Sequence, residues 1–289
     1  MSKSDISDGT TALLGPKGTN SHLALTKMND SFYKQADPKG SGLLASFKEG
    51  IQAVFQAVIT GETQYGLIPI ENQLTGTLPQ NLDSIRSNNL WINKEVVIPI
   101  EFTLCSLDKN VRPSKIFSHP QAFLQCSEFL KLNYSEAELV STTSTAEAAQ
   151  IVASQSNPGF AAISPEHAVW LHNLEILSAG IHDYVDNATR FFLVTQKPKK
   201  HTFEGEKTSI VFSCQHQVGT LYDCLGVFDK NGINLTKLES RPIPEEDWEY
   251  YFYLDFDSNQ PKADIERALV ALEKQTISCQ VLGQYNVIS

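Results

Sequence analysis

A polar cluster surrounds one of the few arginines in this sequence, where an apolar stretch begins. Arg190 lies in residues 187–191 (NATRF), directly before the strand-like run 191–194. The planar guanidinium group of arginine is well shaped to bind a carboxylate through two hydrogen bonds. Polar residues at the start of a strand more often form a surface turn. The residues by themselves therefore allow two interpretations, a surface turn or a carboxylate site in a cleft.

A second polar segment follows an apolar strand at residues 69–77. Asn72, Gln73 and Thr75 stand here in a loop that contains glycine. In α/β folds, ligands bind beyond the ends of strands. This loop is therefore a candidate ligand site, although its residue types do not specify the ligand.

Residues 40–45 (GSGLLA) match the short dinucleotide-binding motif, but no strand pattern precedes them, so we do not expect a nucleotide site there. Other motifs for metals, nucleotides or activated nucleophiles are absent from the sequence. It has no Walker A, HExxH or GxSxG pattern, and its five cysteines never form a CxxC pair. His167 and His172 are five residues apart, about 140° around a helix, so they do not share a ligand face. We therefore expect no cofactor and no metal.

Composition excludes several classes of partner. The 289 residues carry a formal net charge of −10, which argues against binding to nucleic acid or to anionic membrane surfaces. The longest apolar runs are far shorter than the ~20 residues of a membrane-spanning helix. The polar N-terminus resembles neither a secretory signal nor a transit peptide. Together with the unpaired cysteines, these features predict a cytoplasmic protein.

Short apolar runs alternate with helix-like patterns in the first two thirds of the chain. The predicted strands are residues 11–14, 65–70, 96–104, 115–117, 160–163 and 191–194. Within residues 47–60, four apolar residues at offsets 0, 3, 4 and 7 predict one face of a helix that ends at Gly61. They are Ile51, Val54, Phe55 and Val58. Buried strands separated by helices indicate an α/β architecture.

A charged segment with proline and glycine, residues 197–206, is typical of a linker. After it, strand patterns cover residues 208–214, 233–240, 250–256 and 278–284, and two helical stripes separate them. Their order is β-α-β-β-α-β, which is the ferredoxin-like arrangement. The sequence therefore predicts a separate C-terminal domain after the linker.

Seven short segments, spread over nearly the whole chain, share their order with the motifs of one family. They are LGPKGTNSH (14–22), YGLIPIEN (65–72), SHPQA with QC (118–126), STAEAA (144–149), NATRF (187–191), VGTLY (218–222) and NLTKLESRP (234–242). As an ordered set they resemble prephenate dehydratase with a C-terminal ACT domain. The chain has Asn20 where the family motif has Phe, and Gln73 where it has Ser.

The resemblance implies a fold and a reaction. It implies two α/β lobes, similar to periplasmic binding proteins, with the active site between them and a ferredoxin-like ACT regulatory domain behind. We assign residues 1–10 to a disordered tail, 11–200 to the catalytic domain and 201–289 to the ACT domain. The lobes would be roughly 11–95 with 185–200, and 96–184. The implied reaction is the decarboxylating dehydration of prephenate to phenylpyruvate, on the route to phenylalanine, without a cofactor.

The resemblance also assigns roles to individual residues. Thr189 would assist departure of the hydroxyl group, Phe191 would form an apolar wall, and Arg190 would hold a carboxylate or brace the loop. Helix starts at Ser118 and Ser144 could present backbone N–H groups to the dianionic substrate. Helix capping alone is the alternative for Ser144 and Thr145. The substrate-binding candidates are Asn72, Gln73, Thr75, Gln121, Ser144, Thr145, Thr19 and Ser21.

In the C-terminal domain the resemblance implies an inhibitory phenylalanine site at a subunit interface, and hence a dimer or tetramer. Gly219 would permit close backbone approach, and Asn234 could bind the charged groups of an amino acid. Arg241 could do so too, or could pin its strand. The candidate residues are Gly219, Thr220, Leu221, Asn234, Leu235, Glu239, Ser240, Arg241 and Pro242.

Three other functions remain open from the sequence. An arogenate dehydratase and a non-aromatising prephenate decarboxylase would keep the substrate class and change the outcome. A non-catalytic phenylalanine sensor would keep the fold and lose the chemistry.

Overall fold

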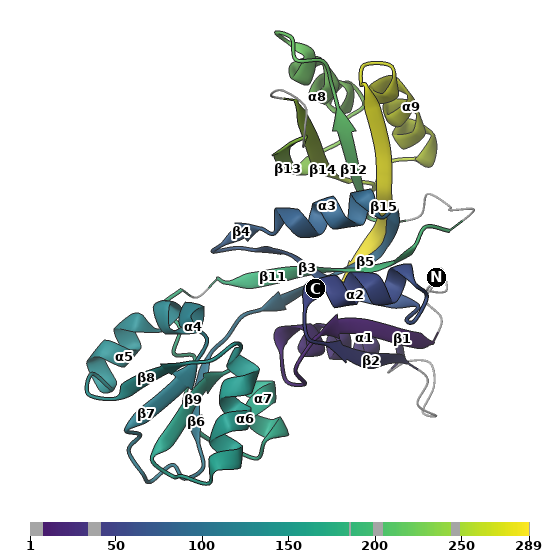
Figure 1. The fold of residues 1–289 in the computed structure, drawn as a ribbon. Coiled ribbons are helices and arrows are strands. Elements are labelled where there is room, and N and C mark those ends of the chain that lie inside the picture. Colours follow the sequence, from purple (N-terminus) through teal and green to yellow (C-terminus); the bar gives the residue numbers. More distant parts are fainter. Residues whose placement is uncertain (1–7, 34–41, 185, 199–204, 244–248, 289) are drawn as a thin grey trace.

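Three parts follow one another through the molecule in Figure 1: a lobe at the lower left, a central lobe and a C-terminal unit at the top. The structure is a computed structural model that describes residues 8–33, 42–184, 186–198, 205–243 and 249–288. Strand β15 (Ser278–Ile288) runs from the C-terminal unit down into the central lobe. The order of the three parts in space places the central lobe between the other two.

The central lobe is a mixed β-sheet with helices packed against it. Its strands are β1 (Gly9–Leu14), β2 (Leu43–Lys48), β3 (Tyr65–Asn72), β4 (Gly76–Thr77), β5 (Leu90–Pro99) and β11 (Ala188–Gln196). Its helices are α1 (Asn20–Tyr33), α2 (Ile51–Ile59) and α3 (Pro79–Ser87). Strand β11 returns from the second lobe and pairs antiparallel with β3 on one side and β5 on the other. Strand β11 is therefore held on both of its edges.

Helix α2 confirms the helical stripe expected in residues 47–60. Val54, Phe55 and Val58 are buried in the core of the central lobe, and Ile51 packs against that core. The helix ends before Gly61, whose φ of +76° suits a glycine. The first residues of the expected segment belong instead to β2, which the sequence analysis did not predict.

The second lobe is a five-stranded sheet in the order β10-β6-β9-β7-β8. Its strands are β6 (Thr103–Ser106), β7 (Lys115–Ser118), β8 (Glu138–Ser141), β9 (Phe160–Ser164) and β10 (Glu175–Ala179). Its helices are α4 (Pro120–Gln125), α5 (Ser127–Asn133), α6 (Thr145–Gln155) and α7 (Glu166–Leu171). The two lobes thus have the two-sheet architecture that was expected.

The expected single strand over residues 96–104 is wrong. Strand β5 ends at Pro99 and β6 begins at Thr103, so the chain crosses between the lobes within this apolar run. Proline has no N–H group to continue a ladder of hydrogen bonds, which gives a reason for the break. The backbone N–H of Ile100 donates to the carbonyl of Asn187 at 2.8 Å. The outgoing and returning crossings therefore lie side by side.

The C-terminal unit confirms the β-α-β-β-α-β order. Its elements are β12 (Lys207–Ser213), α8 (Thr220–Lys230), β13 (Leu235–Pro242), β14 (Tyr250–Asp257), α9 (Lys262–Glu273) and β15. Its sheet has the order β13-β14-β12-β15. Both helices contribute to one apolar core with side chains such as Phe212, Phe228 and Leu272. The helices therefore cover one face of the sheet, which leaves its other face for the central lobe.

Strand β15 joins the C-terminal sheet to the central lobe. It continues past the expected end at residue 284 to Ile288 and pairs parallel with β5. At the crossing point, a Cβ on Gly283 would lie 2.4 Å from the carbonyl oxygen of Ile92. Glycine is therefore required for this close approach. The result is one ten-stranded sheet that spans both parts.

The expected N-terminal tail and the expected linker are only partly described by the structure. Gly9 and Thr10, which we assigned to an N-terminal tail, lie in β1 and pair with β2. Residues 1–7 and 199–204, in the expected tail and linker, lie outside the described part. Within the described ranges, no helix is both long and apolar enough to span a membrane.

Candidate active site

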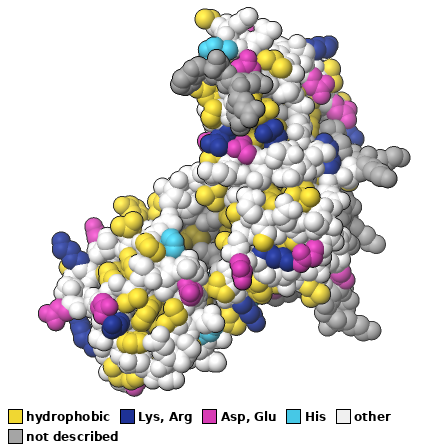
Figure 2. Space-filling model, in the orientation of Figure 1, with side chains coloured by type: hydrophobic (Ala, Val, Ile, Leu, Met, Phe, Trp, Pro, Cys, Tyr) yellow, Lys and Arg dark blue, Asp and Glu magenta, His cyan; other side chains and the backbone are white. Residues whose placement is uncertain are grey.

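A cavity of about 350 Å³ lies between the two lobes. Figure 2 shows a hollowed surface where the lobes meet. Among the described residues that line it, none is Lys, Arg, Asp or Glu, and the one titratable side chain is that of His119. Most of the polar lining consists of hydroxyl and amide groups. The residues expected to act here that line it are Thr19, Ser21, Asn72, Thr75, Gln121, Ser144, Thr145, Thr189 and Phe191.

Asn72 and Thr189 meet where β3 and β11 pair, and both side chains line the cavity. The Asn72 side-chain N–H₂ donates to Thr189 Oγ1 at 3.0 Å. The Asn72 oxygen accepts from the backbone N–H groups of Leu74 and Thr75, which fixes the loop after β3. Because Thr189 Oγ1 accepts the Asn72 bond, its own O–H hydrogen can be donated to a molecule in the cavity.

A chain of side-chain amides leads from this pair to the second lobe. Asn72 Nδ2 also donates to Asn187 Oδ1 at 2.8 Å, and Asn187 Nδ2 donates to Gln125 Oε1 at 3.1 Å. Asn187 and Gln125 are buried, so each amide is held in one orientation by its neighbours. Gln125 belongs to α4 of the second lobe. The orientation of the Thr189 hydroxyl thus depends on contacts from both lobes.

The sequence analysis did not select five polar residues of the cavity as site residues: Asn20, His119, Gln125, Thr143 and Asn187. Four of them stand inside the quoted motif segments: Asn20 in LGPKGTNSH, His119 in SHPQA, Gln125 in QC and Asn187 in NATRF. The signal that could have found them was their place in these segments, next to residues that were selected. Amides such as Asn72 and Gln121 were selected and the hydroxyl of Thr143 was not, so residue type alone did not identify the residues that line the cavity.

Helix α6 starts at the cavity wall. Ser144 is its N-cap, and its Oγ accepts from the backbone N–H of Glu147 at 3.0 Å. Glu147 accepts in turn from the backbone N–H and the hydroxyl of Thr143, and these bonds lower the pKa of its carboxyl group. Ser144 therefore caps the helix, as its alternative interpretation held, while it also lines the cavity. The positive end of the α6 dipole faces the same space.

The helix start expected at Ser118 is wrong. Ser118 is the last residue of β7, it is fully buried, and its hydroxyl donates to the carbonyl of Ile163 at 2.7 Å. Helix α4 begins two residues later, with His119 as its N-cap. Pro120 at the first helical position favours this start, because proline has no N–H group and a fixed φ.

The loop before α1 docks onto the second lobe. His167 Nε2 donates to the carbonyl of Thr19 at 3.0 Å, from α7 across to the central lobe. Gly18 has a φ of +94°, and a Cβ there would lie 3.3 Å from Ala168 and Leu171. The Thr19 hydroxyl donates to the carbonyl of Leu14, which holds the loop closed. These contacts place Thr19 and Ser21 at the cavity wall.

Arg190 points away from the cavity. Its guanidinium forms ion pairs with Glu71 at 2.7 Å, Glu95 at 2.8 Å and Asp255 at 2.9 Å. Along β11 the side chains alternate, so Thr189 and Phe191 line the cavity while Arg190 takes the other face. Of the two roles left open for Arg190, the structure supports bracing. Gln73 is exposed and is likewise not among the described residues that line the cavity.

Sulfur chemistry and metal binding find no support in this cavity. Burial, together with the Asp183 carboxylate, raises the pKa of the nearby Cys126 thiol to about 12, so it is not a nucleophile near neutral pH. The described residues contain no group of three or more His, Cys, Asp or Glu side chains that could hold a metal ion.

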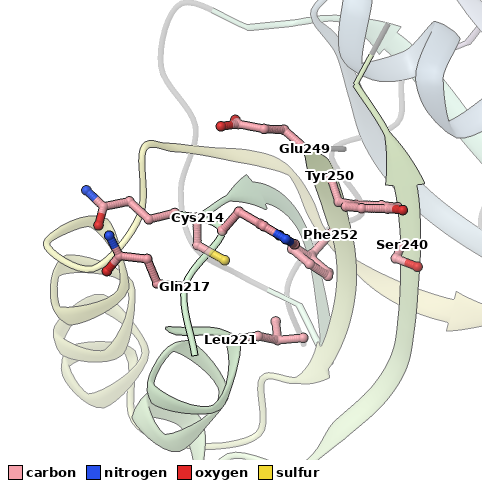
Figure 3. A pocket seen from close by; sticks show the side chains of 9 residues that line it. Cys214, Gln217, Leu221, Ser240, Glu249, Tyr250 and Phe252 are labelled. Carbon is pink, nitrogen blue, oxygen red and sulfur yellow. The ribbon is translucent and has the colours of Figure 1, made fainter. Parts of the chain in front are cut away.

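A second pocket, of about 300 Å³, lies in the C-terminal unit (Figure 3). Of the residues expected to bind phenylalanine, Leu221 and Ser240 line it. Gly219, with a φ of +88°, is the N-cap of α8, and Thr220 begins that helix. The pocket wall also includes residues that were not expected: Cys214, Gln215, His216, Gln217, Glu249, Tyr250 and Phe252.

The other expected phenylalanine-binding residues have partners elsewhere. Asn234 donates to Asp257, and Arg241 donates to Asp83 on α3 of the central lobe. Glu239 accepts from Thr77 Oγ1, again across the interface. The Arg241 contact supports its alternative role of pinning the strand. The remaining two stand at the ends of β13: Leu235 at its start and Pro242 at its end.

Two lobes around a cavity of neutral hydrogen-bonding groups, with a β-α-β-β-α-β unit fused behind, define a class. This is a cleft protein of the periplasmic-binding-protein type that carries an ACT module.

Comparison with known proteins gives the family. The sequence model of prephenate dehydratase matches residues 11–199, and that of the ACT domain matches residues 208–274. The prephenate dehydratase of Methanocaldococcus jannaschii is 35% identical over 275 residues, which is 94% of this chain and 96% of that protein. The chain therefore belongs to the prephenate dehydratase family.

Solved structures agree on the architecture. The prephenate dehydratase of Arthrobacter aurescens in complex with L-Phe has a TM-score of 0.80 at 27% identity, over 96% of this chain and 89% of that chain. A protein described as a quorum-quenching acylase, GqqA, has a TM-score of 0.79 at 25% identity, over 96% of this chain and 97% of that chain. The same architecture is thus described with two different activities.

Proposed function

We propose that this chain is a prephenate dehydratase that converts prephenate to phenylpyruvate. The observation that carries this proposal is the hydrogen bond from Asn72 to Thr189 Oγ1 in a cavity lined by neutral side chains. In the reaction, the bond between the ring and its carboxylate breaks, carbon dioxide leaves, and the electron pair of that bond enters the ring. The ring then expels its hydroxyl group, which leaves as water after taking up a proton. Aromatisation makes the reaction downhill.

Thr189 assists the departure of the hydroxyl group in this mechanism. Hydroxide is a poor leaving group, so a hydrogen-bond donor at its oxygen is the main catalytic requirement. The threonine hydroxyl donates directly or through a water. Phe191, which is 2% exposed, forms an apolar wall that favours loss of charge from the departing carboxylate.

The cavity binds the dianionic substrate through neutral donors. Gln121, Thr145 and the backbone N–H groups at the start of α6 are suited to hold carboxylates, because the helix dipole favours negative charge there. Asn20, which stands where the family motif has Phe, lines the cavity, so this departure affects the substrate contacts directly. Gln73 is exposed and acts at most through the loop backbone, where its N–H donates to Ala188.

Phenylalanine is the proposed inhibitor, bound at the C-terminal pocket. The pocket combines apolar side chains such as Leu221 and Phe252 with polar groups such as Ser240 and Gln217 (Figure 3), a mixture that suits an aromatic amino acid. The solved relative from Arthrobacter aurescens was crystallised with L-Phe. We further propose that the protein forms a dimer or tetramer through its ACT domains and works in the cytoplasm, where its five free cysteines stay reduced.

The test is an assay of phenylpyruvate formation from prephenate by the purified chain, with and without phenylalanine. Thr189→Val should lower kcat by about 10²–10³-fold, as expected for loss of one donor at a developing oxyanion. Thr195→Val is the matched control, because Thr195 lies on the same strand and its hydroxyl donates to Gln64, outside the cavity lining. Full activity of Thr189→Val would remove Thr189 from the mechanism.

The other outcomes separate the alternatives. Loss of prephenate without phenylpyruvate indicates the decarboxylase, and turnover of arogenate alone indicates arogenate dehydratase. Phenylalanine binding without any turnover indicates a sensor. An acylase needs a nucleophile beside a base, and among the described residues the hydrogen-bond partner of Thr189 Oγ1 is the Asn72 amide, which is not a base.

A further inference from the structure

Charged side chains gather where the C-terminal unit meets the central lobe (Figure 2). At the centre of this interface is Arg190, next in sequence to Thr189. It donates to both Glu95 oxygens, through Nε at 3.0 Å and Nη2 at 2.8 Å. Its Nη2 also donates to Asp255 of β14, at 2.9 Å. Glu95 is 1% exposed and Asp255 is 5% exposed, so these bonds are formed away from water.

A second contact of the same kind involves the residue next to Asn72. Glu71 accepts from Arg190 and forms an ion pair with Lys237 of β13 at 3.0 Å. Burial raises the pKa of the Glu71 carboxyl group, but the hydrogen bonds from Lys237 and Arg190 outweigh it and leave the pKa below its usual value. Lys237 also donates to Thr77 Oγ1. Glu71 therefore stays ionised and paired at neutral pH.

Each of the two reaction-site residues thus has a chain neighbour held by the ACT domain. Asp255 holds Arg190 beside Thr189, and Lys237 holds Glu71 beside Asn72. Along a strand, successive side chains point to opposite faces, so Arg190 and Glu71 can reach the ACT domain while Thr189 and Asn72 face the cavity. A shift of β14 or β13 therefore moves Arg190 or Glu71, and the peptide unit between chain neighbours passes this displacement on to Thr189 or Asn72.

The same two ACT strands line the phenylalanine pocket with their alternate residues. On β13, Ser240 lines the pocket, whereas Lys237 faces Glu71. On β14, Tyr250 and Phe252 line the pocket, whereas Asp255 faces Arg190. One face of each strand therefore meets the pocket, and the other face meets the catalytic region.

We propose that Arg190 is a positioning residue that holds Thr189 and Asn72 in place, and that its links to Asp255 and, through Glu71, to Lys237 carry the inhibitory signal from the ACT pocket to the active site. This inference rests on the proposed function and deepens it. A ligand that shifts β13 and β14 changes the fit of Asp255 and Lys237 to their partners. Because Thr189 and Asn72 must keep their mutual hydrogen bond to act, a small displacement of the strand ends lowers turnover.

The test compares Asp255→Asn and Lys237→Met with Asp83→Asn. Asp83 accepts from Arg241 and Tyr253, so it also bridges the ACT domain and the central lobe. Among the described residues, these hydrogen bonds and its ion pair with Arg241 do not involve a chain neighbour of Asn72 or Thr189. Turnover of prephenate is measured against phenylalanine concentration, and phenylalanine binding is measured separately by calorimetry. We expect Asp255→Asn and Lys237→Met to bind phenylalanine but to need at least fivefold more of it for half-inhibition, since allosteric couplings are about 5–150-fold. Asp83→Asn should be inhibited like the wild type.

Arg190→Lys tests the positioning role. Lysine keeps the charge but cannot make the paired contacts of the guanidinium plane. We expect kcat to fall with little change in KM, because the substrate-binding groups of the cavity stay in place. An unchanged kcat would overturn the positioning role, and wild-type inhibition in both Asp255→Asn and Lys237→Met would overturn the signal route.

A second readout keeps this inference separate from the proposed reaction. Amide hydrogen exchange at the ends of β3 and β11 should change when phenylalanine is added to the wild type, and this response should be lost in Asp255→Asn. The measurement needs no turnover, so it also decides the route if the chain does not act on prephenate. If phenylalanine binds without altering exchange in the wild type, the route is overturned.

Discussion

The two faces of the strand pair β3 and β11 differ in chemistry although they are built from adjacent residues. The cavity face presents Asn72 and Thr189, which are neutral and joined by one hydrogen bond. The opposite face presents Glu71 and Arg190, which belong to a largely buried ionic cluster. The cavity face offers neutral hydrogen-bonding groups to a ligand. The charges of the opposite face are already paired within the protein.

This difference shows why the charged side chain of the NATRF motif, that of Arg190, is not among the described residues that line the cavity. A half-buried guanidinium with three carboxylate partners is fixed in place and has little capacity left for another anion. Neutral amides and hydroxyls can donate to a substrate without first breaking an ion pair. The comparison predicts that substitutions on the ionic face change stability and regulation and affect turnover only by displacing the residues of the cavity face. Substitutions on the cavity face change turnover directly.

The largest expected effect is on the ionic face. Arg190→Met leaves Glu95 and Asp255 buried without their main partner, so we expect the free energy of unfolding to fall by about 3–5 kcal/mol. Urea denaturation measures this loss. Arg267→Met is the control, because Arg267 pairs with Asp264 on an exposed helix surface and should cost less than about 1 kcal/mol. Equal stability of the two variants would break the comparison.

The next effect is on the cavity face. Asn72→Asp keeps the size and the loop contacts but removes the N–H₂ donor, so Thr189 would donate to the new carboxylate and turn its hydrogen away from the cavity. The added charge also repels a dianion. We expect about a hundredfold loss of kcat/KM. The loss of urea stability should be about 1–3 kcal/mol, smaller than in Arg190→Met, because the buried Asn187 oxygen loses its donor. Asn88→Asp, at the exposed end of α3, serves as control; a stability loss as large as that of Arg190→Met would remove the distinction between the faces.

A smaller effect is expected where the lobes close over the cavity. Gly18→Ala puts a side chain at a φ of +94° and close to Ala168 and Leu171, so it should cost about 1 kcal/mol or more and raise KM. Gly50→Ala is the matched control, since its Cβ would have no neighbour within 4 Å. Measured KM and thermal stability of the two variants test this contact. Equal KM values would show that the Gly18 loop does not shape the cavity.

The smallest effect is a dependence on pH that differs between the regions. Burial lowers the pKa of His167 in the folded protein. Its contribution to the free energy of unfolding is therefore fully present above pH 6.5 and declines as the pH falls from 6.5 through the lowered pKa. Because the pKa of Glu71 is lowered, its contribution to the free energy of unfolding is fully present above pH 4.5 and is lost in more acidic solution. Between pH 8 and 3, the free energy of unfolding should therefore fall less below pH 6.5 in His167→Asn than in the wild type, while the loss below 4.5 is kept. His22 and His172, whose pKa values burial also lowers, contribute the remaining loss below 6.5. An equal loss below pH 6.5 in both proteins would contradict the assignment.

Much of the fold could be predicted from local patterns. The stripe of Ile51, Val54 and Val58 predicted α2, and the order of elements after the linker predicted the C-terminal unit. Strands β2, β8 and β10 were missed because they are short and partly exposed, which weakens their periodicity. The apolar run over residues 96–104 was predicted as one strand, since hydrophobicity does not report that a chain passes from one sheet to another at Pro99.

The sequence by itself determined the architecture and most of the polar residues that line the cavity, because both follow from local patterns and from ordered motifs. Only the tertiary structure decided which face of β11 meets the cavity, and hence that Arg190 braces while Thr189 lines the site. A motif gives the order of residues along the chain, but not the face of the strand on which the interaction partner of each side chain lies. Glu95 and Asp255, which are far from Arg190 in sequence, set the direction of the Arg190 side chain. Packing of the central lobe against the ACT sheet brings both carboxylates next to its guanidinium.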